Sequence, residues 1–385
     1  MKHCKILYSQ AIIVGRECQR LSDVTIICFH EKLKQYDLGK DHPFRGDRFV
    51  NAMSFFKKRG LFANPQIVLV QGKTATREDL LRVHDKEYVD LVVRLAEENR
   101  SYDAETPVSQ KILEAALLIV GNAIECGETV AANRAGRAVS LGGGHHHAGR
   151  NYGGGFCLFN DVAILIEYLR AKHGMKRFMV LDYDVHFGNG TSDIYYQDPS
   201  VLYVSIHQDP LTIYPGTGFA WQIGEGKGEG FNVNIPLPPG TGDDTYLYAL
   251  NEIFVPMAEE FRPDMIIANG GSDSHFADML GSLGLTANGM FRLSRLIRKT
   301  ADSAAGGKLV LIPGSGYNPR VLPLCWYTLI AGAAGLPEPN VKEDCEPPKE
   351  PVDCRGKVEK TVDDLMKLLR RHWTCFGGFG ISGVQ

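Results

Sequence analysis

The sequence has no excess of positive charge and no long uninterrupted hydrophobic run. Of 385 residues, 42 are Lys or Arg and 45 are Asp or Glu, which gives a net charge of −3. The chain therefore lacks the basic stripe on which nucleic-acid binding depends. Its longest uncharged stretch, 321–337, contains Pro323 and several glycines and is shorter than the ~20 apolar residues of a membrane span. We expect a buried helix there, no direct nucleic-acid binding and no membrane insertion.

The nine cysteines are odd in number and form no Cys-x-x-Cys pair. Residues 1–15 lack the apolar core and small-residue cleavage site of a signal peptide. Both observations favour a reducing, cytoplasmic location, and they argue against a structural zinc cluster.

Seven short apolar runs are spaced so that helices fit between them. Two of the intervening segments, 109–124 and 161–169, have the apolar stripe of a helix. Short strands that alternate with helices predict a parallel sheet in a single large α/β domain. The expected strands are 24–28, 67–70, 138–141, 178–181, 202–206, 265–268 and 309–312.

The composition changes after Leu336. Segment 337–356 holds five prolines and many charges, which predicts an extended linker after a domain that spans 1–336. In the last segment, 357–385, apolar residues recur at the spacing of one amphipathic helix, followed by a loose tail. We expect this helix to pack on the domain; a partner-binding segment is the alternative.

Two clusters of titratable residues follow expected strands. After 178–181 come Asp182, Asp184 and His186, which would share one face of an extended chain at the edge where α/β sheets bind ligands. Buried carboxylates cost several kcal/mol unless they are paired or metal-bound, so helix capping is the weaker reading. After 138–141 the chain has three consecutive histidines, 145–147, among glycines; an exposed polar tract is the alternative.

Two further strand ends carry single candidates. Asp273 follows 265–268 and could equally be a helix N-cap, while Tyr317 lies in a glycine-rich loop where a packed tyrosine is the usual case. Together, Asp184, His186 and Asp273 offer three protein ligands and leave metal positions open, as a hydrolytic metal requires. A histidine base and a tyrosine donor would complete an amide hydrolase.

Nine segments occur in the order found in the histone deacetylase family, which includes acetoin-utilisation proteins and acetylpolyamine amidohydrolases. The sequence closely resembles this family over roughly 20–336, and the resemblance implies an arginase-like α/β fold with a central parallel sheet of about eight strands flanked by helices. The matching segments are 41–49, 83–90, 105–116, 142–148, 154–161, 182–190, 204–218, 270–275 and 313–318.

The resemblance also implies catalytic roles. His147 would be the general base and acid, and His146, held by Asp182, an electrostatic partner or proton donor. Tyr317 would donate a hydrogen bond to the substrate carbonyl. Since Ala148 fixes the frame of the motif, His145 is an extra histidine.

Metal ligands are implied in the same way. Asp184, His186 and Asp273 would hold the catalytic metal, usually zinc, with Fe2+ or another divalent ion as the alternative. Family members also bind potassium, here expected to be structural. The implied potassium ligands are Asp182, Asp184, His186, Ser205 and Ile206 at one site, and backbone around Tyr195, Asp198, Val201 and Phe231 at a second.

The substrate-binding residues follow from the resemblance as well. Phe156 and Tyr214 would form the aromatic walls of a tunnel for an acyl-lysine side chain, with Gly155 and Leu280 nearby. Arg48 would line an internal cavity for released acetate.

Four positions depart from the family pattern. Phe187 replaces a frequent histidine, Asn189 replaces an aspartate that charges the base, and 270–275 reads GGSDSH where AGFDAH is frequent. At the rim, Glu105 takes the place of the usual aspartate, with Asp103 two residues earlier. Asn189 can still orient His147, although a neutral partner stabilises an imidazolium less.

We therefore expect a metal-dependent hydrolase that removes acetyl or another short acyl group from a lysine amine. The nearest alternative is hydrolysis of acetylated polyamines or another small amide. An alternative of another class is a catalytically silent acyl-lysine-binding scaffold. A two-metal arginase-like hydrolase is also conceivable, but its additional aspartates are not evident in the sequence.

Overall fold

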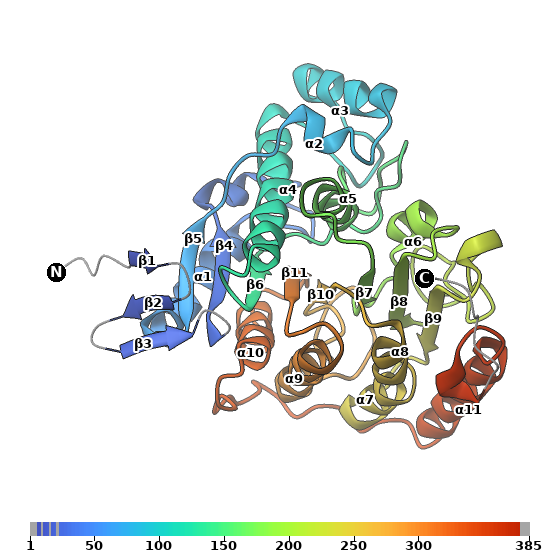
Figure 1. Cartoon of the computed structure of the whole chain (residues 1–385). Helices are drawn as coiled ribbons and strands as arrows, with labels where there is room; N and C mark the ends of the chain where they lie inside the picture. Colours follow the sequence, from blue (N-terminus) through green and yellow to red (C-terminus); the bar gives the residue numbers. More distant parts are fainter. Residues whose placement is uncertain (1–5, 9–10, 15–16, 21–22, 378–385) are drawn as a thin grey trace.

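Eight parallel strands form the central sheet, in the order β5-β4-β6-β11-β10-β7-β8-β9 (Figure 1). The computed structural model describes residues 6–8, 11–14, 17–20 and 23–377. β11 is the last strand in sequence, yet it lies in the middle of the sheet between β6 and β10. The strands are β4 Thr25–Phe29, β5 Ile67–Gln71, β6 Arg137–Ser140, β7 Phe178–Asp182, β8 Val201–Gln208, β9 Asn232–Leu237, β10 Met265–Gly271 and β11 Leu309–Ser315.

All seven apolar runs read from the sequence are strands of this sheet. The eighth strand, β9, was not among them because its sequence, NVNIPL, mixes polar residues and a proline with the apolar ones. A proline is tolerated there because β9 is an edge strand that pairs only with β8. The arginase-like α/β fold with about eight strands is confirmed.

Helices cover both faces of the sheet, α2 to α5 on one side and α7 to α10 on the other (Figure 1). The expected helices at 109–124, 161–169 and 321–337 are α4, α5 and α10. The helices are α1 Asp47–Lys58, α2 Arg77–Leu80, α3 Lys86–Glu98, α4 Gln110–Ala131, α5 Asp161–His173, α6 Asn189–Tyr195, α7 Asp243–Glu252, α8 Phe254–Phe261, α9 Ala287–Ala304, α10 Leu322–Ala334 and α11 Cys354–Leu369.

Local sequence explains where the main helices begin. The side chain of Ser109 accepts the backbone N–H of Ile112 at the start of α4, and Asn160 does the same for Ala163 at the start of α5. These contacts satisfy backbone donors that a helix N-terminus otherwise leaves without partners. None of the described helices is both long and apolar enough to cross a membrane.

Segments at both ends of the chain lie outside the central sheet. A separate antiparallel sheet consists of β1 Ile6–Tyr8, β2 Ala11–Val14 and β3 Glu17–Arg20. At the other end, 337–353 contains no regular element and leads into α11, which buries Val358, Val362, Leu365 and Leu369 and packs on α7 and β9. The expected loose tail falls largely on 378–385, outside the described residues.

Candidate active site

Titratable side chains from four neighbouring strands meet at the carboxyl edge of the sheet. Asp182 is the last residue of β7, and Asp273 and Tyr317 each lie two residues beyond the ends of β10 and β11. Histidines 145–147 follow β6. Parallel pairing of β6, β11, β10 and β7 brings these strand ends together, so residues far apart in sequence form one site.

Asp184, His186 and Asp273 form a compact buried group. One side-chain ligand atom from each lies within 4.8 Å of the other two. Nδ1 of His186 is 3.0 Å from Oδ1 of Asp184 and 3.5 Å from Oδ2 of Asp273. The chain leaves β7 at Asp182, so Asp184 and His186 stand in the turn that follows, not on the strand as the alternation of side chains had indicated.

Electrostatics within this group are strongly coupled. Burial and the nearby charge of Asp184 raise the pKa of Asp273. Burial opposes ionisation of Asp184 as well, but the charges of His146 and His186 and the hydrogen bond from His186 lower its pKa. Although burial disfavours its charged form, the two carboxylates raise the pKa of His186 to about 10. The raised pKa of Asp273 reflects repulsion between two buried carboxylates, which a bound metal cation would relieve.

The donor set fits a divalent metal. Oδ1 of Asp273 accepts hydrogen bonds from Ser315 and the backbone of Val185, whereas Oδ2 has no hydrogen-bond partner among the described residues. A buried carboxylate oxygen without a partner is costly, and a metal ion would remove that cost. Two carboxylates and one imidazole leave coordination positions open for water and substrate, as catalytic metal sites require.

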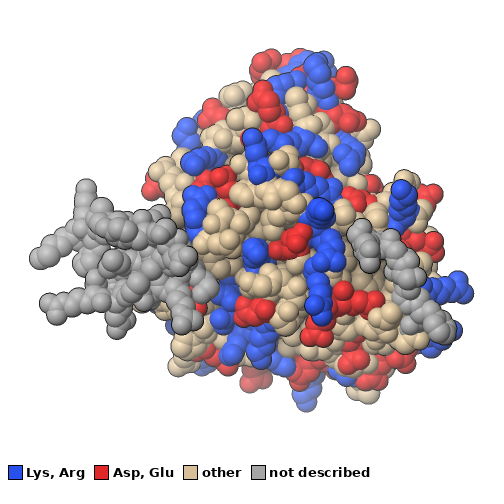
Figure 2. Space-filling view, viewed as in Figure 1, with Lys and Arg blue, Asp and Glu red and all other residues tan. Residues whose placement is uncertain are grey.

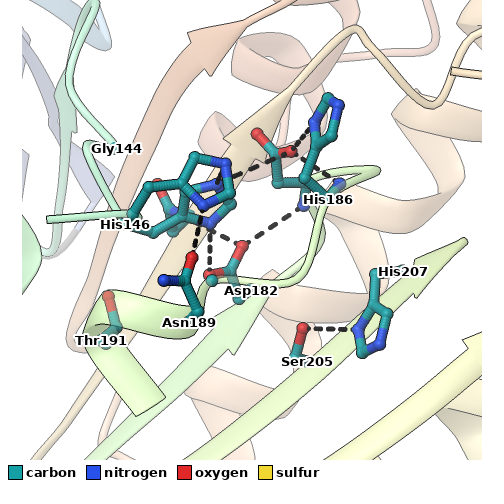
Figure 3. Close-up of polar contacts among 12 residues, drawn as sticks. Gly144, His146, Asp182, His186, Asn189, Thr191, Ser205 and His207 are labelled. Atoms are coloured by element: carbon teal, nitrogen blue, oxygen red, sulfur yellow. Dashed lines mark hydrogen bonds and ion pairs between the residues drawn. The ribbon is translucent and has the colours of Figure 1, made fainter. Parts of the chain in front are cut away.

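Two histidines lie beside this group with different partners (Figure 3). Nδ1 of His146 is 2.8 Å from Oδ2 of Asp182, and Nε2 of His146 is 3.1 Å from Nε2 of His147. Asp182 also accepts hydrogen bonds from Tyr203 and Asn269. Burial works against a charged imidazole, but Asp182 and Asp184 raise the pKa of His146 to about 9. His146 is therefore held as a cation at neutral pH.

His147 has the properties of a base. Its Nδ1 donates to Oδ1 of Asn189 over 2.8 Å, while Nδ2 of Asn189 points to the hydroxyl of Tyr152. This arrangement keeps the proton on Nδ1 and leaves Nε2 of neutral His147 with a lone pair. Burial, together with the charges of His146 and His186, lowers the pKa of His147 well below its usual range.

Tyr317 faces the same space from the opposite side. The carboxylate of Asp278 accepts the backbone N–H groups of Tyr317 (2.7 Å) and Asn318 (3.3 Å), which fixes the loop after β11. Burial raises the pKa of the Tyr317 hydroxyl well above 10, so this hydroxyl keeps its proton. Asp278 was not identified in the sequence, where nothing distinguishes it from a surface acid.

A cavity of about 250 Å³ leads from the surface to these groups. Phe156 and Tyr214 both line it, as do Gly155 and Leu280, so the expected tunnel residues are brought together. A Cβ on Gly155 would lie 2.4 Å from the ring of His147, and its φ of +52° is strained for any other residue. The remaining lining residues are Glu105, His147, His186, Ile213 and Tyr317.

The expected rim acids occupy different positions. Glu105 lines the mouth of the cavity, whereas Asp103 is placed behind it, where Oδ1 of Asp103 accepts the backbone N–H of Glu105 over 2.8 Å. His42, which the sequence did not single out, packs its ring edge-to-face on Phe156 and contacts the Glu105 carbonyl through Nε2 at 3.1 Å. Asp103 thus orients the segment that presents Glu105.

Arg48 lies behind Tyr317 in a neighbouring cavity of about 150 Å³. Its guanidinium stacks 3.7 Å from the centre of the Phe44 ring and donates to the backbone carbonyls of Arg45, Gly314 and Pro43. Burial lowers the pKa of Arg48 to about 10, so it remains charged at neutral pH.

A third and smaller cavity, of about 30 Å³, extends inward from the metal-ligand candidates. It is lined on one side by Asp184, His186 and Tyr317 and on the other by Gly143 and His145. His145 was predicted only as an extra histidine. Its exposed fraction is 4%, so the first histidine of the run belongs to the site and not to an exposed tract.

The residues expected around potassium lie along β8. Ser205 pairs in register with Asp182, and its hydroxyl lies 2.8 Å from Nδ1 of His207 (Figure 3). At the other end of β8, Asp198 binds the guanidinium of Arg170 over 2.8 Å. Ile206 follows Ser205 on β8. The backbone of Asp198 is hydrogen-bonded to Tyr195 and Val201, and the carbonyl of Phe231 accepts the backbone N–H of Tyr203.

An arginase-like fold that carries carboxylate, imidazole and tyrosine groups at the base of a narrow cavity defines an α/β protein of the deacetylase class. The family model for the histone deacetylase domain matches residues 42–333. The chain belongs to the histone deacetylase family. Members of this family are deacetylases and amidohydrolases that act on acetylated amides, and they are generally metal-dependent.

Three relatives are similar to this protein over most of its length. A probable deacetylase of Archaeoglobus fulgidus is 35% identical over 360 residues, which cover 92% of this chain and 99% of that protein. The acetoin utilization protein AcuC of Bacillus subtilis is 34% identical and covers 81% of this chain and 82% of its own. A histone deacetylase-like amidohydrolase of Pseudomonas aeruginosa is 38% identical and covers 68% and 69%.

Among solved structures, the crystal structure of the HDA15 HD domain superposes with a TM-score of 0.81 at 28% identity. The superposition covers 92% of this chain and 96% of that domain.

Proposed function

We propose that the protein is a metal-dependent hydrolase that removes acetyl or another short acyl group from lysine side-chain amides. The observation that carries this proposal is the buried group of Asp184, His186 and Asp273, of which His186 lines the 250 Å³ cavity together with His147 and Tyr317. Zinc is the metal we propose, with Fe2+ or another divalent ion as the alternative. When bound, it would acidify water and polarise the scissile carbonyl.

The protein's own residues supply the proton transfers. Nε2 of His147 accepts the proton of the attacking water and later delivers it to the leaving amine as the C–N bond breaks. His146, held as a cation by Asp182, stabilises negative charge that develops beside it. The hydroxyl of Tyr317 donates to the carbonyl oxygen, where charge accumulates in the transition state. Asn189 keeps His147 in the tautomer that this sequence of steps requires.

The shape of the cavity supports a lysine side chain. Phe156 and Tyr214 face a space with apolar lining from Ile213 and Leu280, which suits a chain of methylene groups. Glu105 at the rim can accept hydrogen bonds from the substrate backbone. An acetylated polyamine has a similar alkyl chain and additional positive charges that Glu105 and Asp103 would attract, so it is the second candidate substrate.

We also propose the organisation around this site. A catalytic domain, 1–336, is followed by a linker, 337–356, and a C-terminal helix with its tail, 357–385. Potassium would be structural at the two groups along β8. The seven described cysteines are unpaired, which supports a reducing, cytoplasmic setting. We propose an acyl-lysine protein or acetylated amine as partner. On the face shown in Figure 2, Lys and Arg are interspersed with Asp and Glu, without the continuous basic stripe that nucleic-acid binding needs.

One assay tests the proposed function. Purified full-length protein is loaded with zinc, or separately with Fe2+, and offered acetyl-lysine peptides and acetylated polyamines. Turnover of the peptides supports the proposal, and preference for polyamines selects the second candidate. Tight peptide binding without turnover by either metal form would instead identify an acyl-lysine-binding scaffold.

A further inference from the structure

We propose that His145 is a specificity-determining residue, which makes the inner end of the acyl site polar and thereby restricts the substrate to the smallest acyl groups. The inference rests on the proposed function and specifies which acyl chain the site accepts. It concerns the one histidine of the run 145–147 to which catalysis assigns no role.

The imidazole of His145 is buried without hydrogen bonds. Its exposed fraction is 4%, and neither Nδ1 nor Nε2 has a hydrogen-bond partner among the described residues. Native proteins rarely leave both polar atoms of a buried side chain unpartnered, because each loses its hydration without compensation. Water or a polar ligand in the adjoining cavity would supply the missing hydrogen bonds.

His145 lines the cavity where an acyl group would have to lie. The inner cavity and the mouth cavity share His147, His186 and Tyr317 in their linings, so they meet at the proposed scissile bond. A lysine chain enters through the mouth cavity, and we infer that the acyl group beyond the carbonyl extends into the inner cavity. His145 and Phe44 line the inner cavity and are absent from the mouth.

The imidazole is held in place on several sides. Its ring lies 4.9 Å from the ring of Tyr36, whose hydroxyl donates to the carbonyl oxygen of Phe156 over 2.7 Å. The backbone N–H of His145 donates to Asp161 over 2.8 Å. These contacts hold the ring of His145 in place, and the same tyrosine links it to the tunnel wall.

The ring offers one donor and one acceptor at neutral pH. Burial, with the charges of His146 and Arg48, lowers the pKa of His145 to about 3, so the imidazole is neutral. A neutral imidazole can bind water but provides no counter-charge for an anion.

A longer acyl chain should therefore lower kcat/KM. The inner cavity measures about 30 Å³, more than the about 10–15 Å³ that one water molecule needs on the same measure. An acetyl methyl group leaves room for His145 to keep a polar partner, whereas a butyryl chain would displace that partner and cover the ring with methylene groups. We expect kcat/KM for butyryl-lysine to be about 10- to 100-fold below that for acetyl-lysine, the factor associated with one or two lost buried hydrogen bonds.

The test compares His145→Leu with His145→Gln in the metal-loaded, full-length protein. Leucine has a similar volume but no polar atom, whereas glutamine keeps a donor and an acceptor. With matched acetyl-, propionyl- and butyryl-lysine peptides, His145→Leu should raise the butyryl-to-acetyl ratio of kcat/KM by about 10-fold or more. His145→Gln should keep the wild-type ratio. His145→Val serves as a second apolar variant if the leucine protein does not fold.

A binding measurement separates this inference from the proposed function. Acetate and butyrate are titrated into the same metal-loaded proteins and binding is followed by ligand-observed NMR, which needs no turnover. Tighter binding of acetate by the wild type and a reversed order in His145→Leu support the inference even if every acyl-lysine peptide proves inert. An unchanged order of the two acids and an unchanged ratio of kcat/KM in His145→Leu would overturn it.

Discussion

Nδ1 of His147 donates to a neutral amide, Oδ1 of Asn189, over 2.8 Å. Its neighbour His146 has the carboxylate of Asp182 at the same distance. The two imidazoles lie 4.1 Å apart between ring centres. Burial lowers the pKa of both, but Asp182 and Asp184 raise that of His146, whereas the charges of His146 and His186 lower that of His147 further.

Replacing Asn189 by Asp should therefore alter the pH dependence of catalysis. A carboxylate at this position favours protonated His147 and raises its pKa. Since the base must be neutral, activity increases as pH rises through this pKa, and the acidic limb of kcat/KM should move to higher pH. Full pH profiles of both proteins check this.

Tyr152→Phe is the matched control for that experiment. It removes the partner of the Asn189 amide without adding charge, so its acidic limb should stay close to the wild-type position. An Asn189→Asp protein with an unmoved limb would contradict the role of Asn189 beside the base.

Replacing a proposed metal ligand should abolish metal binding. Wild-type protein should retain about one equivalent of divalent ion, whereas Asp184→Ala or His186→Ala should retain almost none and lose activity, because truncation removes a ligand and leaves the remaining buried charges unpaired. Elemental analysis after gel filtration measures this. Asp278→Asn, which perturbs the Tyr317 loop and not the ligands, should keep its metal. Full occupancy in both ligand variants would rule the assignment out.

Tyr317→Phe should slow turnover without preventing binding. Its hydroxyl helps the transition state more than the bound substrate, so kcat should fall about 10²- to 10³-fold while the Kd of an acetyl-lysine peptide changes little. If Tyr317 merely packs in its loop, Tm would fall and kcat would remain near wild type. Measuring kcat, Kd and Tm on one metal-loaded preparation distinguishes the two.

Segment 337–353 is fastened to the domain through a buried histidine. Nδ1 of His275 accepts the backbone N–H of Ala277, so its Nε2 carries the proton and donates to Oε2 of Glu343 over 3.2 Å. The other oxygen of Glu343 accepts the backbone N–H of Ala287, the first residue of α9. Both carboxylate oxygens of Glu343 thus accept a hydrogen bond, and the side chain needs an acceptor at each of these two positions.

Glu343→Gln should destabilise the protein by about 1–3 kcal/mol, because its amide can place an N–H against the N–H of His275. Denaturant unfolding measures the change. Glu338→Gln is the control: Glu338 lies in the same segment but binds Asn288 at the surface, so its effect should stay within about 0.5 kcal/mol. Equal stabilities of the two variants would show that the bond to His275 contributes nothing.

The strands with continuous apolar runs could be predicted from the sequence because both faces of a parallel sheet are covered. β9 could not, since its sequence, NVNIPL, mixes polar residues and a proline with the apolar ones. In the site, the motif order placed Asp184, His186, Asp273 and Tyr317 together.

The sequence could not reveal contacts between residues that lie far apart along the chain. Asp278 supports Tyr317 from 39 residues away, Glu343 reaches His275 from 68, and Tyr36 packs on His145. Each looks ordinary in its own segment, because its role depends on which residue faces it after folding. Which side chains contact one another is decided by the folded sheet and not by the local sequence pattern.

The central position of β11 has a consequence for biosynthesis. Chains emerge from the ribosome N-terminus first, so β4 to β6 and β7 to β10 are made long before the strand that must join them. Until residue 315 is available, β6 and β10 each present an unpaired edge that can recruit a strand from another nascent chain. The last strand thus joins the two halves of the sheet. Nonsense truncations upstream of it should therefore yield insoluble fragments instead of partially active enzyme.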